Sequence, residues 1–187
     1  MTRVIVSTDS EEIAEVSKKY GAEVPFIRPA ELATDSAKAI PVIQHAVAFM
    51  EDLEGEQYDA VMMLQPTTPF RRSSDINEAI RILEESGADS VISVVDVEGH
   101  HPARMKFLKE GRLIDPPYCE AYENQPRQEL ETMYLRNGAI YLTRREVLLQ
   151  NSFKGKDCRA WIMDTHRSVN IDTPLDFALA EFMLDKL

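Results

Sequence analysis

Short continuous apolar runs alternate along this chain with segments whose apolar residues recur every three or four positions. Continuous runs predict strands buried on both faces of a sheet, and we place them at residues 3–8, 23–27, 60–64, 90–95, 139–143 and 160–163. The helical spacing predicts a first helix after the Asp9-Ser10 cap, closed by Gly21, and further helices at residues 36–53, 75–85, 144–150 and 174–187. Strands that alternate with helices in this way predict an α/β fold, doubly wound around a mostly parallel sheet.

Residues 97–134 interrupt this alternation. Helical spacing disappears there, four prolines cluster at positions 102, 116, 117 and 126, and short alternating pieces such as residues 105–108 take over. No long flexible linker flanks the segment. We therefore expect a β-rich or irregular lobe inserted into a single domain of residues 1–187.

Composition narrows the classes of partner. The net charge is −11, with 32 acidic against 21 basic residues, which argues against nucleic acid or an anionic membrane as a binding partner. No run approaches the ~18 to 20 apolar residues of a membrane span, and the start shows no signal-peptide pattern, so we expect a soluble, cytoplasmic protein. The two cysteines, Cys119 and Cys158, lack a C-x-x-C spacing and fit a reducing compartment.

Polar residues at strand ends are the first candidates for chemistry. Gln65 directly follows the apolar run at 60–64, and ligands of open α/β sheets lie outside the carboxyl ends of the strands. Asn170 and Asp172 alternate in an extended segment before the last helix, so both side chains point to the same side and could reach one cation. The alternative for Asp172 is a helix cap, which is the commoner use of aspartate at such a position.

Other polar residues have two interpretations each. Arg28 precedes Pro29 at a predicted strand end, where it serves either a ligand or the solvated surface. Asn137 is either a substrate ligand or a turn residue before Gly138. The chain contains no G-x-S-x-G, Walker G-x-x-x-x-G-K-[ST] or G-x-G-x-x-G motif, which removes the corresponding hydrolase, P-loop and dinucleotide classes.

Four segments together resemble the acylneuraminate cytidylyltransferases, the CMP-sialic acid synthetases. They are FIRPAELATD at residues 26–35, MLQPTTPFR at 63–71, RNGAIYL at 136–142 and VNIDTPLDFALAE at 169–181. The resemblance extends from Arg3 to the C-terminus and implies the fold of the nucleotide-diphospho-sugar transferases. Related sugar nucleotidyltransferases fit the NIDTPLDF ending less well.

The resemblance implies a reaction. CTP and a sialic acid or related nonulosonic acid give the CMP-sugar and pyrophosphate, with Mg²⁺ bound by Asp172 and Asn170, where the family commonly has two acidic residues. Arg28 and the main chain of Ala37 would face the cytosine, whereas Ala39 has no hydroxyl to offer it. Gln65, Arg104, Arg127 and Asn137 would approach the sugar acid, and a guanidinium suits its carboxylate because it donates two parallel hydrogen bonds. Asp172, Gln65 and Arg127 are the expected catalytic residues.

The matching region begins part-way through the family's domain. No counterpart of the family's opening strand and R-x-G-S-K loop precedes Arg3, and such a loop cradles the triphosphate. We therefore expect an N-terminally truncated member that is inactive as this chain. The alternative is a catalytically silent remnant that acts by binding or dimerisation. Sialic, legionaminic and pseudaminic acids are not distinguished.

The lobe at residues 97–134 predicts a homodimer. It carries aromatic and aliphatic side chains with no regular element of its own to bury them, and such residues are enriched at protein interfaces. Family dimers form through the same lobe, so the resemblance points the same way. We expect Arg104 or Arg127 to lie close to the partner subunit.

Overall fold

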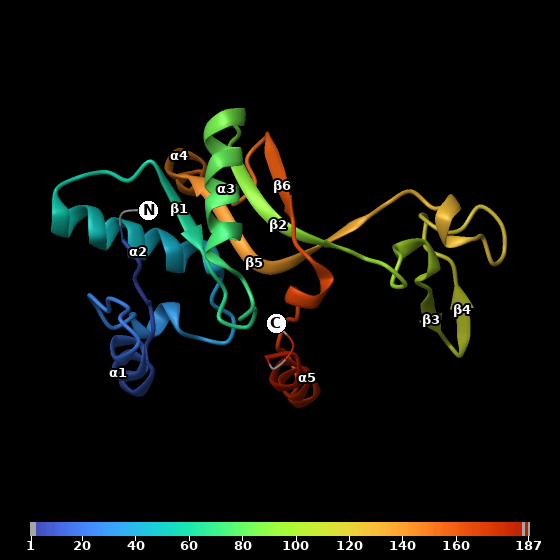
Figure 1. The fold of residues 1–187 in the computed structure, drawn as a ribbon, viewed down its shortest axis with the longest axis horizontal. Helices are drawn as coiled ribbons and strands as arrows, with labels where there is room; N and C mark the ends of the chain where they lie inside the picture. Colours follow the sequence, from blue (N-terminus) through green and yellow to red (C-terminus); the bar gives the residue numbers. More distant parts are fainter. Residues whose placement is uncertain (1–2, 185, 187) are drawn as a thin grey trace.

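The structure is a computed structural model that describes residues 3–184 and 186. Its centre is a four-stranded sheet in the order β1-β5-β2-β6. The strands are β1 (Ala60–Met63), β2 (Ser90–Asp96), β5 (Tyr134–Arg144) and β6 (Cys158–Ile162). All four were predicted, but β5 is much longer than residues 139–143 because its first half continues outward toward the lobe (Figure 1).

The sheet is mixed. β1, β2 and β6 run in the same direction, as predicted, and β2 pairs with β6 in parallel. β5 lies between β1 and β2 and is antiparallel to both, so the expectation of a mostly parallel set of pairings is corrected. The physical reason is that the chain leaves β2 through the lobe and returns from it directly along β2, which is a hairpin-like path and requires no crossover helix.

Helices cover both faces of the sheet, as a doubly wound fold requires. In Figure 1, α3 (Ser73–Ser86) lies in front of the strands and the fainter α4 (Arg145–Leu149) lies behind them. The core forms where α3 meets the sheet, from Ala79, Leu83, Val91, Ala139, Ile140, Leu142 and Met163. The α/β class is therefore confirmed. Within the described residues, no helix is long and apolar enough to span a membrane.

The other helices agree with the predicted segments to within a few residues. They are α1 (Glu11–Lys19), α2 (Ala39–Glu54) and α5 (Pro174–Leu184). Ser10 caps α1 by accepting a hydrogen bond from the Ile13 amide, as the Asp9-Ser10 pair predicts. α2 is fastened to α4 by the Glu51–Arg145 ion pair and by the hydrogen bond from Gln44 to the Leu148 carbonyl.

The two strands predicted at residues 3–8 and 23–27 do not form. These segments run side by side in parallel, but they share only one isolated bridge, between Ile5 and Glu23. The ladder stops because the next residue in register to donate is Pro25, which has no amide hydrogen. Pairing resumes once, where the Arg28 amide donates to the Thr8 carbonyl at 2.8 Å.

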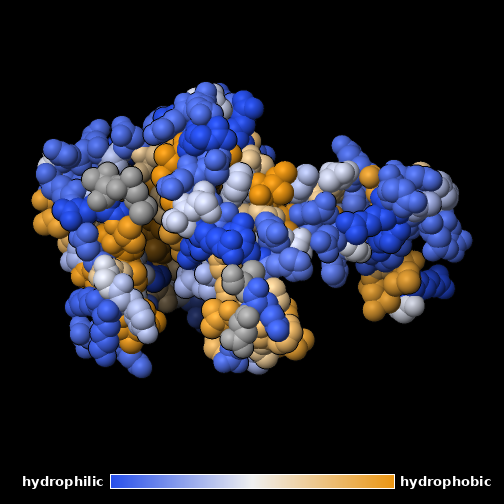
Figure 2. All heavy atoms as spheres, viewed as in Figure 1, coloured by the Kyte–Doolittle hydropathy of each residue, from blue (hydrophilic) through white to orange (hydrophobic). Residues whose placement is uncertain are grey.

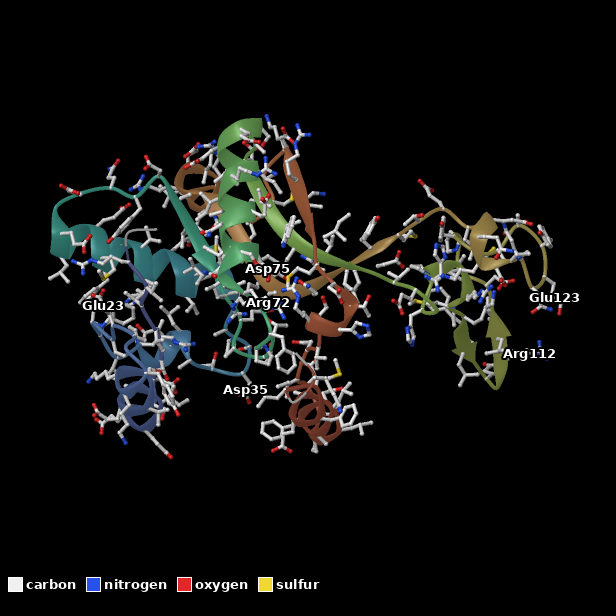
Figure 3. All side chains as sticks on the ribbon, in the orientation of Figure 1. Glu23, Asp35, Arg72, Asp75, Arg112 and Glu123 are labelled. Atoms are coloured by element: carbon white, nitrogen blue, oxygen red, sulfur yellow. The ribbon has the colours of Figure 1, made fainter. Side chains whose placement is uncertain are left out.

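The inserted lobe projects from the sheet on an arm formed by the outer parts of β2 and β5 (Figure 1). It holds a hairpin of β3 (Phe107–Lys109) and β4 (Arg112–Ile114), together with two short 3-10 helices, η2 (Pro102–Arg104) and η3 (Arg127–Glu129). The β-rich or irregular character expected for residues 97–134 is confirmed. Arg112 and Glu123 lie in this lobe, far from the Arg72 and Asp75 side chains at the base of α3 (Figure 3).

A buried ion pair links α3 to the end of the chain. Asp75, in the first turn of α3, accepts hydrogen bonds from Nη1 and Nη2 of Arg167, at 2.5 and 3.1 Å. Its carboxylate also accepts hydrogen bonds from the Arg72 backbone amide at 2.7 Å and from the Trp161 indole at 3.2 Å. Burial by itself would raise the pKa of Asp75, but these hydrogen bonds outweigh it and hold the pKa below its ordinary value.

Asp75→Asn is expected to destabilise the fold by about 3–5 kcal/mol, because it leaves Arg167 as an unpaired buried charge. Since folding lowers the pKa of Asp75, its contribution is complete above the unfolded pKa of about 3.9 and is lost as the pH falls through the lower folded value. Urea unfolding followed by fluorescence of the single tryptophan, Trp161, at neutral pH and below pH 4 tests this. A loss that is no larger than that of Glu85→Gln, an exposed partner of Arg81, contradicts it.

Candidate active site

The turn after β1 carries Gln65 and is held in place by hydrogen bonds from Arg71. The Arg71 Nη1 donates to the carbonyl oxygens of Gln65 at 2.9 Å and Thr68 at 2.7 Å. The Gln65 side chain lies against Gly138 in β5, where an added Cβ would be only 2.5 Å from Oε1, and Gly138 has a φ of +80°. The side-chain amide of Gln65 makes no hydrogen bond within the described residues, so its donors and acceptor remain available to a ligand.

A cavity opens beside this turn. Its volume is about 310 Å³, near the lower end of the range for small-molecule pockets, about 300–1,000 Å³. The predicted ligand residues Arg28, Ala37 and Gln65 all line it, together with Ala39, Val42 and Ile43. Three of the sequence-predicted site residues therefore lie in one place. They come from the loop before η1 (Ala30–Leu32), the loop before α2, and the end of β1.

Arg28 is oriented from within the protein. Its Nη2 donates to the Ser7 carbonyl at 2.6 Å, and this hydrogen bond holds the Arg28 side chain beside the cavity. Its Nε is buried and has no hydrogen-bond partner in the part of the chain that is described. A buried donor without a partner costs free energy, so this arrangement of Arg28 must be held by other contacts such as the one with Ser7.

The segment with Asn170 and Asp172 lies directly beside the Gln65 turn. The Ile171 amide donates to the Thr67 carbonyl at 2.8 Å, which pairs the two segments through their backbones. Asn170 and Asp172 point to the same side, as predicted, and the Asn170 amide donates to the Asp172 carboxylate at 2.5 Å. Both residues are exposed to solvent.

Asp172 does not cap α5, although capping was the likelier use of such a residue from sequence alone. Thr173 and Asp176 form the cap instead: the Asp176 carboxylate accepts the Thr173 amide at 2.8 Å, and the Thr173 hydroxyl accepts the Asp176 amide at 3.3 Å. Hydrogen bonds from Thr173 and from the Asp172 amide hold the pKa of Asp176 below its ordinary value. The Asp172 carboxylate therefore takes no part in the helix cap and stays exposed beside Asn170.

The pair Asn170 and Asp172 is compatible with Mg²⁺ but does not make a closed site. Among the described residues, no group of three or more His, Cys, Asp or Glu side chains could hold a metal ion. Mg²⁺ typically keeps several waters and takes only one or two carboxylates from a protein, the remainder coming from bound phosphates. One carboxylate and one amide, both exposed, match that mode of binding once the Asn170 amide rotates to present its oxygen.

Asn137 is committed to the interior. It is only 5% exposed; its Oδ1 accepts the Ser93 hydroxyl at 2.6 Å, and its Nδ2 donates to the Ser168 hydroxyl at 2.9 Å. These contacts favour a structural role over the direct ligand role that the resemblance implied. Through Ser168 it also fixes the chain two residues before Asn170.

Arg104 and Arg127 lie in the lobe, away from Gln65. Arg104 pairs with Glu120 at 3.3 Å and donates to the Gln125 carbonyl. Arg127 approaches Asp96 at 3.6 Å, in a contact that is too exposed to contribute much stability. Arg127 lines a second cavity, of about 260 Å³, which shares no residue with the first. The structure therefore does not bring these two arginines to the Gln65 turn.

Two residues that support the site were not identified from sequence. Arg71 was read only as part of the MLQPTTPFR motif, although it organises the turn. Gly138 was explained by turn chemistry, but it lies inside β5 and leaves room for Gln65. A glycine in a strand interior is itself a signal for close approach by another group.

The fold and this strand-end site define a nucleotidyltransferase-like α/β protein. A CMP:2-keto-3-deoxy-manno-octonic acid synthetase solved with CTP shares the fold, with a TM-score of 0.64 and 17% identity. The match covers the whole of this chain and 83% of that one. A 4-diphosphocytidyl-2C-methyl-D-erythritol synthase shares it with a TM-score of 0.53 and 15% identity. At these identities the likeness concerns the fold alone.

Sequence comparison identifies the family. The family model for Cytidylyltransferase matches residues 1–159, and the chain therefore belongs to the cytidylyltransferase family and is a nucleotidyltransferase. It is 34% identical to the post-translational flagellin modification protein B of Campylobacter coli, over 97% of this chain and 76% of that protein.

Two further relatives carry names of the predicted family. Identity to the CMP-N,N'-diacetyllegionaminic acid synthase of Legionella pneumophila is 31%, over 97% of this chain and 78% of that protein. Identity to the N-acylneuraminate cytidylyltransferase of Escherichia coli is 33%, over 95% of this chain but only 41% of that enzyme. The resemblance drawn from the four sequence segments is confirmed.

Asp172→Ala and Asp176→Ala should distinguish the roles of the two carboxylates near the start of α5. Asp176→Ala removes a cap and is expected to lower Tm by roughly 2–4 °C. Asp172→Ala removes no contact of the helix and should leave Tm within about 1 °C. Thermal unfolding by circular dichroism measures both. A Tm loss for Asp172→Ala as large as that for Asp176→Ala would restore the capping role.

Proposed function

We propose that this protein binds CTP and a sialic-type nonulosonic acid and joins them into the CMP-sugar. The anomeric hydroxyl of the acid attacks the α-phosphorus, a new P–O bond forms, the bond to the β-phosphate breaks, and pyrophosphate leaves as the hydroxyl loses its proton. The names of the Legionella and Escherichia relatives support this choice of product.

The cavity beside Gln65 is the proposed site for the cytosine. Arg28 lines the cavity, and its guanidinium would donate a hydrogen bond to a cytosine carbonyl or ring nitrogen. Ala37 contributes main chain, while the small side chains of Ala37 and Ala39 leave space for a flat base. Gln65 lines the same cavity, and its side-chain amide, which is not engaged within the described residues, would bind the sugar acid.

Asp172 and Asn170 are proposed to hold Mg²⁺ against the triphosphate. When bound, the ion neutralises charge on the phosphate oxygens as it develops in the transition state. The chain's own contribution is to place one carboxylate and one amide oxygen beside the turn that carries Gln65. That placement, fixed by the hydrogen bond from Ile171 to Thr67, is the observation on which the proposal rests.

Isothermal titration calorimetry with CTP and UTP in the presence of Mg²⁺ tests the nucleotide site. CTP is expected to bind at least about tenfold more tightly than UTP, a difference of roughly 1.4 kcal/mol. Arg28→Met should weaken CTP binding by a similar factor because it removes the donor from the cavity. Arg81→Met, in an exposed ion pair of α3, is the matched control and should have no effect. Equal affinities for CTP and UTP contradict the proposal.

A pyrophosphate-release assay with CTP, Mg²⁺ and N-acetylneuraminic acid then separates enzyme from binding module. Pyrophosphate is expected to form only when CTP, the acid and Mg²⁺ are all present, and Asp172→Ala should slow its release at least about tenfold. Release that does not require the acid, or that Asp172→Ala leaves unchanged, would contradict the proposed reaction.

The same proposal includes a homodimer joined through the lobe. The β3–β4 hairpin is apolar on both faces: Phe107 pairs with Ile114, and Leu108 pairs with Leu113. Leu108 and Leu113 are 72% and 74% exposed. Figure 2 shows this apolar patch at the tip of the lobe, surrounded by polar residues. Such a patch is more stable against a second copy than in water, and a dimer would also offer Arg104 and Arg127 to a neighbouring site.

Sedimentation velocity at micromolar concentration is expected to show a dimer that Leu108→Ser combined with Leu113→Ser converts to a monomer. The control is Leu175→Ser on α5, a leucine of comparable exposure outside the lobe, which should leave the dimer intact. A monomer in the unmodified protein, or a dimer that only the α5 change disrupts, contradicts the lobe interface.

A further inference from the structure

Arg71 is a half-buried cation that pairs with no carboxylate of the described residues. Its Nη1 donates to the carbonyl oxygens of Gln65 and Thr68, to the Thr68 hydroxyl at 3.2 Å and, at 3.4 Å, to the carbonyl of Ala139. Burial lowers the pKa of the Arg71 guanidinium, and no carboxylate of the described residues offsets that effect. A charge taken out of water without a counter-ion is costly, and the carbonyl oxygens recover only part of that cost.

The acceptors of Arg71 come from two separate segments. Gln65 and Thr68 belong to the turn after β1, whereas Ala139 belongs to β5 and directly follows Gly138. Gly138 is the residue on which the Gln65 side chain rests. One guanidinium therefore fixes both the backbone from which the Gln65 amide projects and the strand that supports that amide.

The same turn also sets the position of the proposed metal ligands. Thr67 lies between Gln65 and Thr68, whose carbonyl oxygens accept from Arg71. The Thr67 carbonyl accepts a hydrogen bond from the amide of Ile171, which lies between Asn170 and Asp172. A shift of the turn would move the Gln65 amide relative to the Asp172 carboxylate. Lysine could keep the charge, but its ammonium is a compact group on a flexible stem and lacks the fixed planar geometry of the guanidinium.

We propose that Arg71 is a positioning residue: it holds the Gln65 amide over Gly138 and keeps it in register with the Asn170–Asp172 segment. This rests on the proposed function in assigning Gln65 to the sugar acid. The competing role is a purely structural one, in which Arg71 stabilises the domain without setting the geometry of the site.

NMR of the ligand-free protein tests the geometry independently of any activity. In Arg71→Met, we expect loss of the nuclear Overhauser effects between the Gln65 side-chain amide and Gly138. We also expect at least about tenfold faster hydrogen exchange at the Ile171 amide, with exchange at the core residue Val91 unchanged. Arg71→Lys should show the same pattern more weakly and is the second variant if Arg71→Met does not fold. Arg81→Met is the control.

Two NMR outcomes overturn the proposal. Unchanged Gln65–Gly138 effects together with unchanged Ile171 exchange mean that the turn does not need Arg71. Equal acceleration at Ile171 and Val91 in both variants means that Arg71 serves global stability only.

Dissociation constants for the two proposed substrates test the effect of Arg71 on function. Arg71→Lys should raise the dissociation constant for N-acetylneuraminic acid about tenfold and change that for CTP by less than about twofold. In a Gln65→Ala background, the same change should have no further effect on the acid. An equal loss for both ligands overturns the positioning role. If the unmodified protein does not bind N-acetylneuraminic acid at all, the proposed function fails, and the NMR result alone decides the role of Arg71.

Discussion

The hydrogen bond from the Ile171 amide to the Thr67 carbonyl holds the two halves of the site together. One half is the turn after β1, which carries Gln65 and opens onto the Arg28 cavity. The other is the extended segment with Asn170 and Asp172. A single backbone contact at 2.8 Å is a weak link by itself, so its persistence depends on how firmly each half is anchored.

Both anchors are made of partly buried polar interactions. The segment before Asn170 is fixed by the Arg167–Asp75 ion pair and by the Ser168–Asn137 hydrogen bond, and the turn before Thr67 is fixed by Arg71. Each of these groups is costly when left unpaired, which makes alternative arrangements of the two segments unfavourable. The apolar core between α3 and the sheet supplies stability, whereas these polar contacts determine where the ligand groups lie.

The sequence was most informative where local pattern decides structure. The apolar runs located β1, β2 and β6, the Asp9-Ser10 pair located the start of α1, and the i, i+2 spacing placed Asn170 and Asp172 on one side. Pattern failed where the outcome depended on distant partners. The direction of β5 follows from the path of the lobe, and the segments at residues 3–8 and 23–27 form no regular ladder because Pro25 cannot donate. The engagement of Asn137 by Ser93 and Ser168, and of Arg71 by carbonyl oxygens, is invisible to periodicity because the partners lie up to 68 positions away.

Family motifs identified the class of enzyme but not the arrangement of its groups. They pointed to Arg28, Ala37 and Gln65, which line one cavity, and to Arg104 and Arg127, which the lobe carries away from it. The exposed hairpin of that lobe offers a physical reason for the separation, since a surface that is apolar on both faces is suited to association rather than to folding back on its own core.

The central claim is that the Arg28 cavity and the Asn170–Asp172 segment are parts of one nucleotide site. A crystal structure of the protein with CTP and Mn²⁺, whose anomalous scattering marks the metal, tests it most directly. We predict the cytosine in the cavity against Arg28 and Ala37, with the metal bound to the Asp172 carboxylate and to the phosphates of the same nucleotide. A nucleotide bound outside this cavity, or a metal that does not touch Asp172, would contradict the claim.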